Sequence, residues 1–371
     1  MKSSKFFIFY FLLSLITLGS PMVGHDINRS AFGEPDTLIT LIWAGDVMGH
    51  SPQFEAAYND EIGRYEYDIC FANVKNDIEH ADFAIANLEV PLAGKPYSGY
   101  PNFSSPDELL DGLQNAGFDI ILTANNHVVD RGKQGLERTL HQLKSRSLYF
   151  AGSYLNQKQR DTLYPVMIRK HGIKIALLNY TYGTNGIVVT EPNVVNYIDS
   201  AQIEQDIRKA DSLGADFKIM TVHWGTEYQL HSNKKQQGLA QYFADLGVDA
   251  IIGGHPHVVQ EYSVIYNKAG KPIPVYYSIG NYISNQRKPH TDGGIMVELT
   301  LNTRNKSIQN NRYIPVYVYK GILHNQYQYH LIPTYNFVEN PLAYQIPSED
   351  STKLLFFHEA TIERLKNEQY R

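Results

Sequence analysis

The chain of 371 residues contains a single cysteine, Cys70. One thiol excludes an internal disulfide, so a hydrophobic core has to stabilise the fold. The same scarcity removes paired thiolates from the side chains available to bind a metal ion. Cys70 lies beside Phe71 and Val74 in a stretch with helical spacing, a context that favours a buried structural thiol over a reactive one.

An excess of positive charge is also missing. Lys and Arg number 33 against 38 Asp and Glu, which gives a net charge of −5. The chain therefore has no general electrostatic attraction to nucleic acid or anionic lipid, and we expect no nucleic-acid partner. With 43% hydrophobic and 19% charged residues, the composition is that of a folded globular protein. The length allows one large domain with an appendage, or two domains.

The N-terminal apolar run, Phe6 to Leu18, is short for a free-standing membrane span. Lys2 and Lys5 precede this run, and Gly-Ser-Pro at 19–21 follows it. A basic start, a short apolar run and small residues at its exit predict a signal peptide over residues 1–20 and export to the periplasm or cell surface. An uncleaved N-terminal membrane anchor is the alternative. No cysteine stands directly after the run, which argues against a lipoprotein anchor.

Segments with strand and helix patterns alternate from residue 38 onwards, which predicts an α/β fold with strands buried on both faces. We expect a main domain over residues 37–304 and a C-terminal extension of strands and a helix over 305–371. The expected strands cover residues 38–44, 83–86, 118–123, 164–169, 173–180, 217–222, 250–252, 275–279 and 294–301. The expected helices cover residues 65–79, 107–116, 133–146, 199–213 and 352–365, and another contains Leu239, Phe243 and Leu246.

Polar side chains gather where the expected strands end. The five loops carry Asp46 with His50, Glu89, Asn126 with His127, His223, and His255 with His257. Ligand crevices of open α/β sheets form at the carboxyl ends of the strands, so we expect these side chains to meet at one edge. A lone histidine is usually structural, but recurrence at one edge is typical of an assembled site. Imidazole, carboxylate and amide donors suit Mn²⁺, Fe or Zn²⁺, and we predict one or two such ions.

Six motifs follow one another along the chain. They are GDVMGH (45–50), NLEVPL (87–92), ANNHVVDRG (124–132), HWGTEY (223–228), GGHPHVVQ (253–260) and YSIGNYISNQ (277–286). Together they resemble the CapA-type proteins of bacterial capsule synthesis, which are associated with poly-γ-glutamate and are distant relatives of calcineurin-like metallophosphoesterases. The resemblance runs from about residue 38 to 300. It implies a metallophosphoesterase-like layered sandwich with the order α/β/β/α.

The resemblance also implies roles for single side chains. Asp46 matches the first metal-ligand aspartate of the phosphoesterase pattern, and Glu89 takes the place of its bridging aspartate. Asn126 resembles the ligand asparagine of the Gly-Asn-His motif. His127 resembles the adjacent histidine, which protonates a leaving oxygen and is therefore the candidate catalytic residue.

Three further histidines complete the implied ligand set. His223 and His255 resemble ligands of one metal ion, and His257 resembles a ligand of the other. The chain departs from the pattern at Asp46-Val47-Met48, where phosphoesterases carry Asp-x-His, and a thioether is a poor ligand for a hard ion. His50 is a candidate replacement, either as a ligand or as a polar partner. The departure bears more on two-metal cleavage than on metal binding.

Two other polar residues are candidates for a metal ligand or for support of one. Glu227 follows His223 closely and is a candidate partner that orients its imidazole. Asn281 ends a strand pattern at the same edge and is a candidate donor to an oxyanion, with turn formation as the alternative.

The sequence leaves two classes of function open. The first is a metal-dependent hydrolase that acts outside the cytoplasm on a phosphoester or related bond of an envelope polymer, with a variant that cleaves or transfers γ-glutamyl amides. The second is a non-catalytic component that binds an anionic capsule polymer for assembly or export, in a capsule-synthesis complex at the membrane. The Asn126-His127 pair favours the enzyme, and Met48 favours the binding role.

Overall fold

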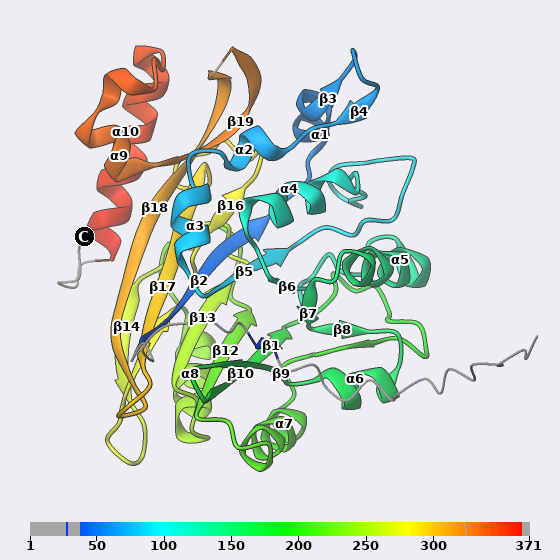
Figure 1. Cartoon of the computed structure of the whole chain (residues 1–371), viewed down its shortest axis with the longest axis vertical. Helices are drawn as coiled ribbons and strands as arrows, with labels where there is room; N and C mark the ends of the chain where they lie inside the picture. The colour runs from blue at the N-terminus through cyan, green and yellow to red at the C-terminus, as the bar shows by residue number, and fades with distance from the viewer. Residues whose placement is uncertain (1–26, 29–37, 324, 366–371) are drawn as a thin grey trace, which may run out of the picture.

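The computed structural model describes residues 27–28, 38–323 and 325–365 (Figure 1). Within these residues the strands form one sheet of seven strands, one of eight, and two pairs of short strands. The expected signal peptide, residues 1–20, lies outside the described residues. None of the helices that are described combines the length and apolar character needed to span a bilayer.

The seven-stranded sheet has a parallel centre. Its spatial order is β1 (Ile27–Asn28), β9 (Val166–Lys170), β10 (Ile173–Thr181), β12 (Phe217–His223), β13 (Ala250–Gly254), β15 (Pro272–Tyr276) and β14 (Tyr262–Tyr266). Strands β10, β12, β13 and β15 run parallel, whereas β9 and β14 pair with their neighbours β10 and β15 in antiparallel fashion. The hairpin expected over 164–180 is present as β9 and β10.

The second sheet combines strands from the early part and the late part of the chain. Its spatial order is β19 (Gln326–Pro333), β18 (Ser307–Leu323), β17 (Gly293–Asn302), β2 (Leu38–Val47), β5 (Phe83–Leu88), β6 (Ile120–Leu122) and β7 (Tyr149–Ala151), and β16 (Asn281–Ile283) also pairs with β2. Strands β2, β5, β6 and β7 are parallel, and β17 to β19 form an antiparallel meander. The Tyr-rich stretch after residue 312 therefore extends this sheet. The short pairs are β3 (Tyr58–Asn59) with β4 (Arg64–Tyr65), and β8 (Ser153–Tyr154) with β11 (Val194–Val195).

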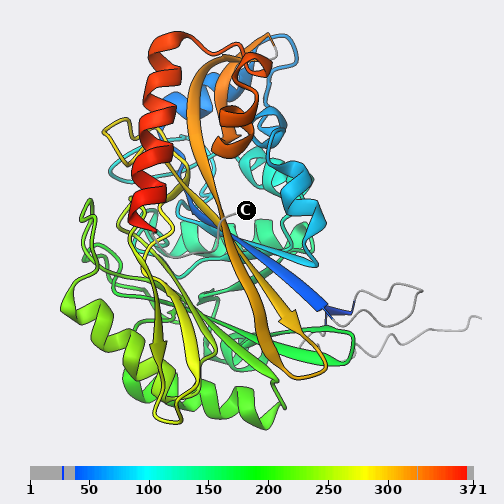
Figure 2. The same cartoon turned by 90° about the vertical axis from the view of Figure 1, so that its left-hand side faces the viewer.

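Helices lie on opposite sides of the strands, as the green α7 and α8 and the cyan α3 and α4 show in Figure 2. The helices are α1 (Ser51–Ala57), α2 (Asp68–Phe71), α3 (Lys75–His80), α4 (Glu108–Ala116), α5 (Gly132–Ser145), α6 (Gln157–Leu163), α7 (Ser200–Ser212), α8 (Lys234–Asp245), α9 (Thr334–Glu339) and α10 (Ser348–Arg364), with a 3₁₀ turn at Pro341–Ala343. Helix α7 shows why the pattern folds this way. Asp199 caps its first turn by accepting a hydrogen bond from the Gln202 N–H, and Ile203 and Ile207 are buried on its inner face.

One expected element differs from the structure. The single helix expected over residues 65–79 is two short helices, α2 and α3, separated by a turn. Ile69 and Val74 are too far apart for one helical face, which needs spacings of three or four residues. The turn is fixed from outside, because the Asn73 side chain donates a hydrogen bond to the Leu331 carbonyl on β19. Cys70 is buried in α2, as predicted, and burial raises the pKa of its thiol.

Both sheets share one hydrophobic core, which includes Trp43 of β2 and Leu178 of β10. Parallel strands of both sheets end at a common edge, where the loops after β2, β5, β6, β12 and β13 come together. The core therefore fixes the strand ends to which these loops are attached. That edge carries the predicted polar side chains.

Candidate metal centre

The predicted donors converge at this edge and are withdrawn from solvent. Asp46 lies near the end of β2, Glu89 directly follows β5, and His223 is the last residue of β12. His255 and His257 follow β13. All five side chains are at most 3% exposed, so the fold, rather than water, decides which groups they meet.

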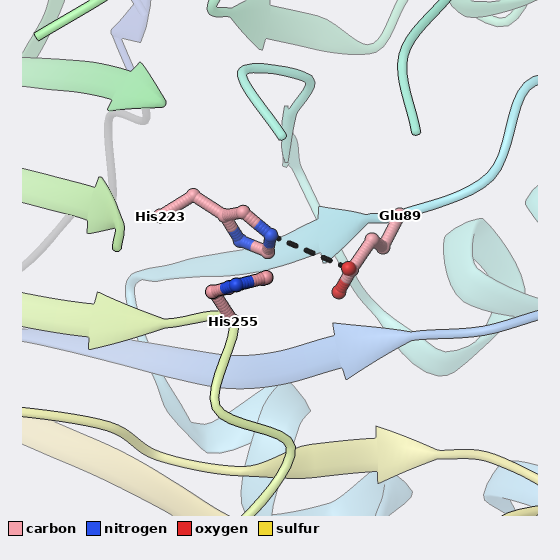
Figure 3. A group of neighbouring side chains, drawn as sticks. All are labelled: Glu89, His223 and His255. Carbon is pink, nitrogen blue, oxygen red and sulfur yellow. Dashed lines mark ion pairs between the residues drawn. The ribbon is translucent and has the colours of Figure 1, made fainter. Parts of the chain in front are cut away.

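One group of donors comprises Glu89, His223 and His255 (Figure 3). The ligand atoms that these three side chains offer all lie within 4.8 Å of one another. The Nε2 atom of His223 lies 3.3 Å from Oε1 of Glu89. The imidazole rings of His223 and His255 are 4.8 Å apart between centroids. A single ion would therefore be within reach of all three.

A second group comprises Asp46, Glu89 and His257, again with ligand atoms within 4.8 Å. The Nδ1 atom of His257 lies 3.4 Å from Oδ2 of Asp46, and its Nε2 atom lies 3.8 Å from Oε1 of Glu89. Glu89 belongs to both groups. Its carboxylate therefore has the position of a bridge between two ions.

The unsatisfied atoms of the cluster fit a cation. Neither carboxylate oxygen of Glu89 accepts a hydrogen bond of regular geometry from the described chain, and Nδ1 of His255 has no hydrogen-bond partner there. The nearest candidate donor, Nε2 of His223, lies closer to Oδ1 of Asn126, at 2.7 Å. Buried polar atoms without partners are rare and costly. A divalent ion would satisfy these lone pairs together.

The electrostatics of the cluster are unfavourable without an ion. Burial raises the pKa of Glu89, and the nearby charge of Asp46 raises it further. Burial and the neighbouring imidazoles lower the pKa of His255 to about 2. Burial alone would raise the pKa of Asp46, but the hydrogen bond with His257 and the charges of His223 and His257 lower it. Carboxylates and neutral imidazoles crowded in this way are the donors that a divalent ion binds.

Asn281 fixes the orientation of His257. The Asn281 amide nitrogen lies within hydrogen-bond distance of the His257 carbonyl, the Gln286 side-chain oxygen and the Thr291 carbonyl. Its Oδ1 atom consequently faces Nδ1 of His257, at 3.0 Å, and accepts a hydrogen bond from it. In the neutral imidazole this leaves the lone pair on Nε2, the atom that points toward Glu89.

Replacing Asn281 by alanine should weaken metal binding about 10–100-fold, because the His257 ring loses the group that orients it. Competition with a metallochromic indicator measures this affinity. The matched control is Asn76→Ala on the exposed face of α3, which should bind the ion as the wild type does. Equal affinity of both variants would show that the Asn281 contact is not needed.

Asn126 and His127 occupy the loop after β6, at the side of the first group. The Asn126 amide donates to Oδ1 of Asn185, at 3.1 Å, so its own oxygen faces His223. Nδ1 of His127 lies 2.8 Å from Oδ2 of Asp130, which also accepts the N–H of Phe103. Burial alone would lower the pKa of His127, but the Asp130 hydrogen bond and the charge of Glu89 outweigh it and raise the pKa. His127 therefore holds a proton more tightly than an ordinary imidazole does.

Met48 and His50 lie beside the cluster but belong to neither donor group. Met48 is buried, and its N–H donates to the Ile283 carbonyl. Nδ1 of His50 lies 3.0 Å from Oε1 of Gln53, and the His50 ring packs edge-on against Phe103 at 5.3 Å between centroids. Burial lowers the pKa of His50 to about 4, so this ring is neutral at physiological pH.

Glu227 lies on the surface, in the turn after β12. No hydrogen bond joins it to His223 among the residues described, and Asn126 holds that imidazole instead. Glu227 acts on the neighbouring Tyr228: burial raises the pKa of this phenol to about 12, with a further contribution from the Glu227 charge and hydrogen bond.

The loop His255-Pro256-His257 has an unusual backbone conformation. His255 has a φ of +96° and His257 a φ of +57°, which non-glycine residues seldom adopt. The N–H of His255 donates to Oδ2 of Asp46 at 3.1 Å. A Cβ atom on Gly254 would lie 3.0 Å from Oδ1 of Asp46, so only glycine allows this approach without a shift.

Comparison with known proteins identifies the family. The model of the family described as bacterial capsule synthesis protein PGA_cap matches residues 40–286, more than half of the chain. The chain belongs to this family. All six predicted metal ligands and His127 fall inside the matched residues.

Two relatives of this chain are both named CapA. The capsule biosynthesis protein CapA of Bacillus anthracis is 26% identical over 281 residues, which cover 73% of this chain and 66% of that protein. The PGA biosynthesis protein CapA of Bacillus subtilis is 26% identical over 283 residues, covering 72% and 68% respectively. The chain thus spans about two thirds of the length of these relatives.

A solved structure agrees with the fold. The NAD nucleotidase of Haemophilus influenzae superposes with a TM-score of 0.50 and 12% identity, covering 90% of this chain and 57% of that one. At this identity the likeness concerns the fold alone. The metallophosphoesterase-like layered sandwich expected from the sequence is confirmed.

Several residues around the centre of this family member were not foreseen as part of it. The bond of Asp130 to His127 was not predicted, although a spacing of three residues in a turn is a usable signal. Asn87 donates to Oδ1 of Asp46 at 2.8 Å. The Tyr182 ring lies 4.5 Å from that of His255, and Asn185 bonds Asn126. The loop carrying Tyr182 and Asn185 has no pattern that marks it.

The metal affinity of this family member should rise with pH. Burial alone would lower the pKa of His257, but Glu89 and Asp46 raise it to about 9. Below that pH the imidazole carries a proton that binding must displace, so the affinity for Mn²⁺ should increase about tenfold per pH unit between pH 6 and 8. Indicator competition at pH 6, 7 and 8 measures it, and a constant affinity would contradict the prediction.

Proposed function

We propose that this chain is a divalent-metal-dependent hydrolase that acts on a phosphoester or related bond in capsule polymer metabolism. The observation that carries the proposal is the pair of buried donor groups sharing Glu89, with His127 beside them. Packing alone does not require so many lone pairs to face one another. Asp46, Glu89, Asn126, His223, His255 and His257 would hold one or two ions, with Mn, Fe or Zn favoured by the donor types.

The chain's own residues then have distinct tasks. When bound, a divalent ion polarises a phosphoryl or carbonyl oxygen and activates water near neutral pH. His127 donates a proton to the leaving oxygen, and Asp130 holds the ring through its Nδ1 atom. Asn126 and Asn281 keep His223 and His257 in place. The low exposure of the donors excludes bulk water from the reacting groups.

A substrate of this enzyme would be an envelope polymer or a phosphoester formed during its synthesis. Membership of a capsule synthesis family supports a polymer-related role. Together with the basic and apolar start of the chain, it supports action at the periplasm or cell surface, within a capsule-synthesis complex at the membrane. A γ-glutamyl amide is the second bond type that such a centre would attack.

A second candidate function is a non-catalytic one, the binding of an anionic capsule polymer for its assembly or export. It is favoured by Met48, which supplies no ligand to the group of Asp46, Glu89 and His257. Among the described residues, three carboxylate or imidazole side chains form that group, and a weakly held ion there would bind polymer carboxylates without cleaving a bond.

Metal analysis joined to turnover separates the two functions. The purified chain should contain divalent metal and hydrolyse bis(p-nitrophenyl) phosphate, or release aniline from a γ-glutamyl anilide if the bond is an amide. Metal content without turnover of either substrate would favour the binding function. A chain that takes up no Mn²⁺, Fe or Zn²⁺ would rule out the hydrolase, for the phosphoester and the γ-glutamyl amide alike.

A further inference from the structure

Three exposed tyrosines lie close to the metal ligands. Tyr100 belongs to the segment between β5 and α4, Tyr182 directly follows β10, and Tyr228 lies in the turn after β12. Tyr182 is 42% exposed, Tyr228 46% and Tyr100 76%, whereas the metal-ligand histidines are at most 3% exposed. We call these three residues the tyrosine rim. Tyrosine is enriched at binding surfaces because its ring is apolar and its hydroxyl group is polar.

Two rings of the rim lie beside metal ligands. The Tyr182 ring is 4.5 Å from the His255 ring between centroids, and the Tyr228 ring is 6.2 Å from the His257 ring. Tyr182 also lies nearly parallel to His223, at 6.4 Å, and no other ring contacts it within the described chain. Because these imidazoles are buried and Tyr182 is exposed, the face of its ring opposite the imidazoles is open to a substrate.

Tyr100 lies on the side of the centre that holds the candidate proton donor. Its ring is 6.4 Å from that of Phe103, which packs edge-on against His127 at 4.8 Å. Burial is the main cause of the raised pKa of Tyr228, and the nearby phenol of Tyr100 contributes to it. The three rings therefore belong to one surface.

The charges that contact the rim balance one another. In the part of the chain that is described, Nζ of Lys288 lies 5.8 Å from the centroid of the Tyr228 ring, and Glu227 forms a hydrogen bond with the same residue. The guanidinium of Arg287, next to Lys288, donates to main-chain carbonyls instead. One ammonium and one carboxylate leave no net charge, so the rim is not suited to select a chain of carboxylates.

Neutral hydrogen-bonding groups accompany the rings. The Gln286 amide nitrogen lies 3.5 Å from the Tyr228 hydroxyl, and Asn185 is exposed three residues after Tyr182. The Tyr182 hydroxyl has no hydrogen-bond partner among the described residues. Burial raises the pKa of this phenol to about 12, so it keeps its proton at neutral pH. Amide and hydroxyl groups of this kind match sugar hydroxyls, which both donate and accept.

We propose that the tyrosine rim binds the uncharged sugar ring of a sugar phosphate ester whose phosphate lies at the metal centre. The partly positive C–H groups on one face of a sugar suit the negative face of an aromatic ring. Tyr182 is the main stacking surface, and Tyr100 bounds the side of His127. The inference rests on the proposed function, because an ion held by the donors would bind the phosphate.

The test is calorimetric titration of the Mn²⁺-loaded full chain with glucose 1-phosphate and with ethyl phosphate, which has the same headgroup but no sugar. We expect glucose 1-phosphate to bind about tenfold more tightly, the combined effect of two aromatic contacts. Equal binding of the two phosphates would overturn the proposal. Tighter binding of a γ-linked glutamate trimer or of adenosine 5′-phosphate would do the same, because charge or a flat base would then be the recognised feature.

Variants locate the contact. Tyr182→Ala and Tyr100→Ala should each lower the preference for glucose 1-phosphate about threefold and leave ethyl phosphate binding unchanged, whereas Tyr182→Phe should keep most of it. The matched control is Tyr266→Ala, an exposed tyrosine on β14, which should keep all of it. An unchanged preference in both alanine variants would overturn the proposal. An equal loss for both phosphates would also overturn it, because the rings would then act only through the metal ligands.

The result can be separated from that of the proposed function. A preference for glucose 1-phosphate without turnover of bis(p-nitrophenyl) phosphate would support the sugar site and count against the hydrolase. Turnover combined with equal binding of the two phosphates would support the hydrolase and overturn the sugar site.

Discussion

The Glu89→Gln variant should purify without metal and should bind Mn²⁺ or Zn²⁺ more than about 100-fold more weakly than the wild type. Loss of a group that only orients a ligand costs about 10–100-fold, and Glu89 faces both donor groups directly. An amide oxygen is a poorer donor than a carboxylate for both positions at once. Elemental analysis and indicator competition measure the loss.

The same substitution should stabilise the metal-free protein. Burial and Asp46 raise the pKa of Glu89 above its ordinary value of 4.5, so its ionised form disfavours the folded state. Glutamine removes this penalty, and the gain in melting temperature should be present above about pH 4.5 and vanish below it, where the carboxyl is neutral in both states. Added metal should raise the melting temperature of the wild type only.

Glu227→Gln is the matched control for this experiment. Glu227 is an exposed glutamate close to the cluster but outside both donor groups. Its substitution should leave metal content and melting temperature unchanged. If Glu89→Gln kept its metal, or if both variants lost it equally, a bridging position for Glu89 would be refuted.

The His127→Ala variant should lose about 10²–10⁴-fold in kcat and retain its metal. The loss should depend on the leaving group. An alkyl phosphodiester needs a proton on its leaving oxygen and should show the full effect, whereas p-nitrophenolate leaves without one and should show a much smaller effect. Steady-state kinetics on the two substrate types measure the difference.

Two further variants separate proton transfer from general damage. Asp130→Asn keeps the shape of the loop but removes the carboxylate that holds His127, so it should reproduce part of the loss with the same leaving-group dependence. His141→Ala, on the exposed face of α5, should have no effect. An equal loss for both leaving groups would speak against His127 as the proton donor.

The sequence predicted the sheet strands well because each is a short apolar run that ends in a polar loop. Leu38–Val47 and Phe217–His223 stop close to where the pattern stops. The first carries Asp46 as its last residue but one, and the second ends in His223. The local sequence pattern was less reliable where contacts with distant strands decide where a helix ends. The break between α2 and α3 is fixed by Asn73 and β19, more than 250 residues away, and its local signal is limited to the five-residue spacing of Ile69 and Val74.

The donors themselves were visible in the sequence, but their partners were not. Donor types and their places at strand ends can be seen in single residues such as Glu89 and His223. Which atom faces which depends on hydrogen bonds that cross the fold. Asn281 had been considered as an oxyanion donor, and the structure shows its amide fixed to His257. His50 and Glu227 lie close in sequence to the donors, yet the structure places them outside both groups.

The pairing of β2 with β16 and β17 has a consequence for biogenesis. Asp46 lies opposite Asn281 in the sheet, so the strand that carries the first donor is completed only by segments made near the end of synthesis. In a nascent chain of which only the first half has been synthesised, the donor side chains present would not yet be held together and would not favour binding of an ion. Ion uptake should therefore indicate that folding is complete. Because the ion binds the folded state alone, its binding free energy adds to the free energy of unfolding of the protein.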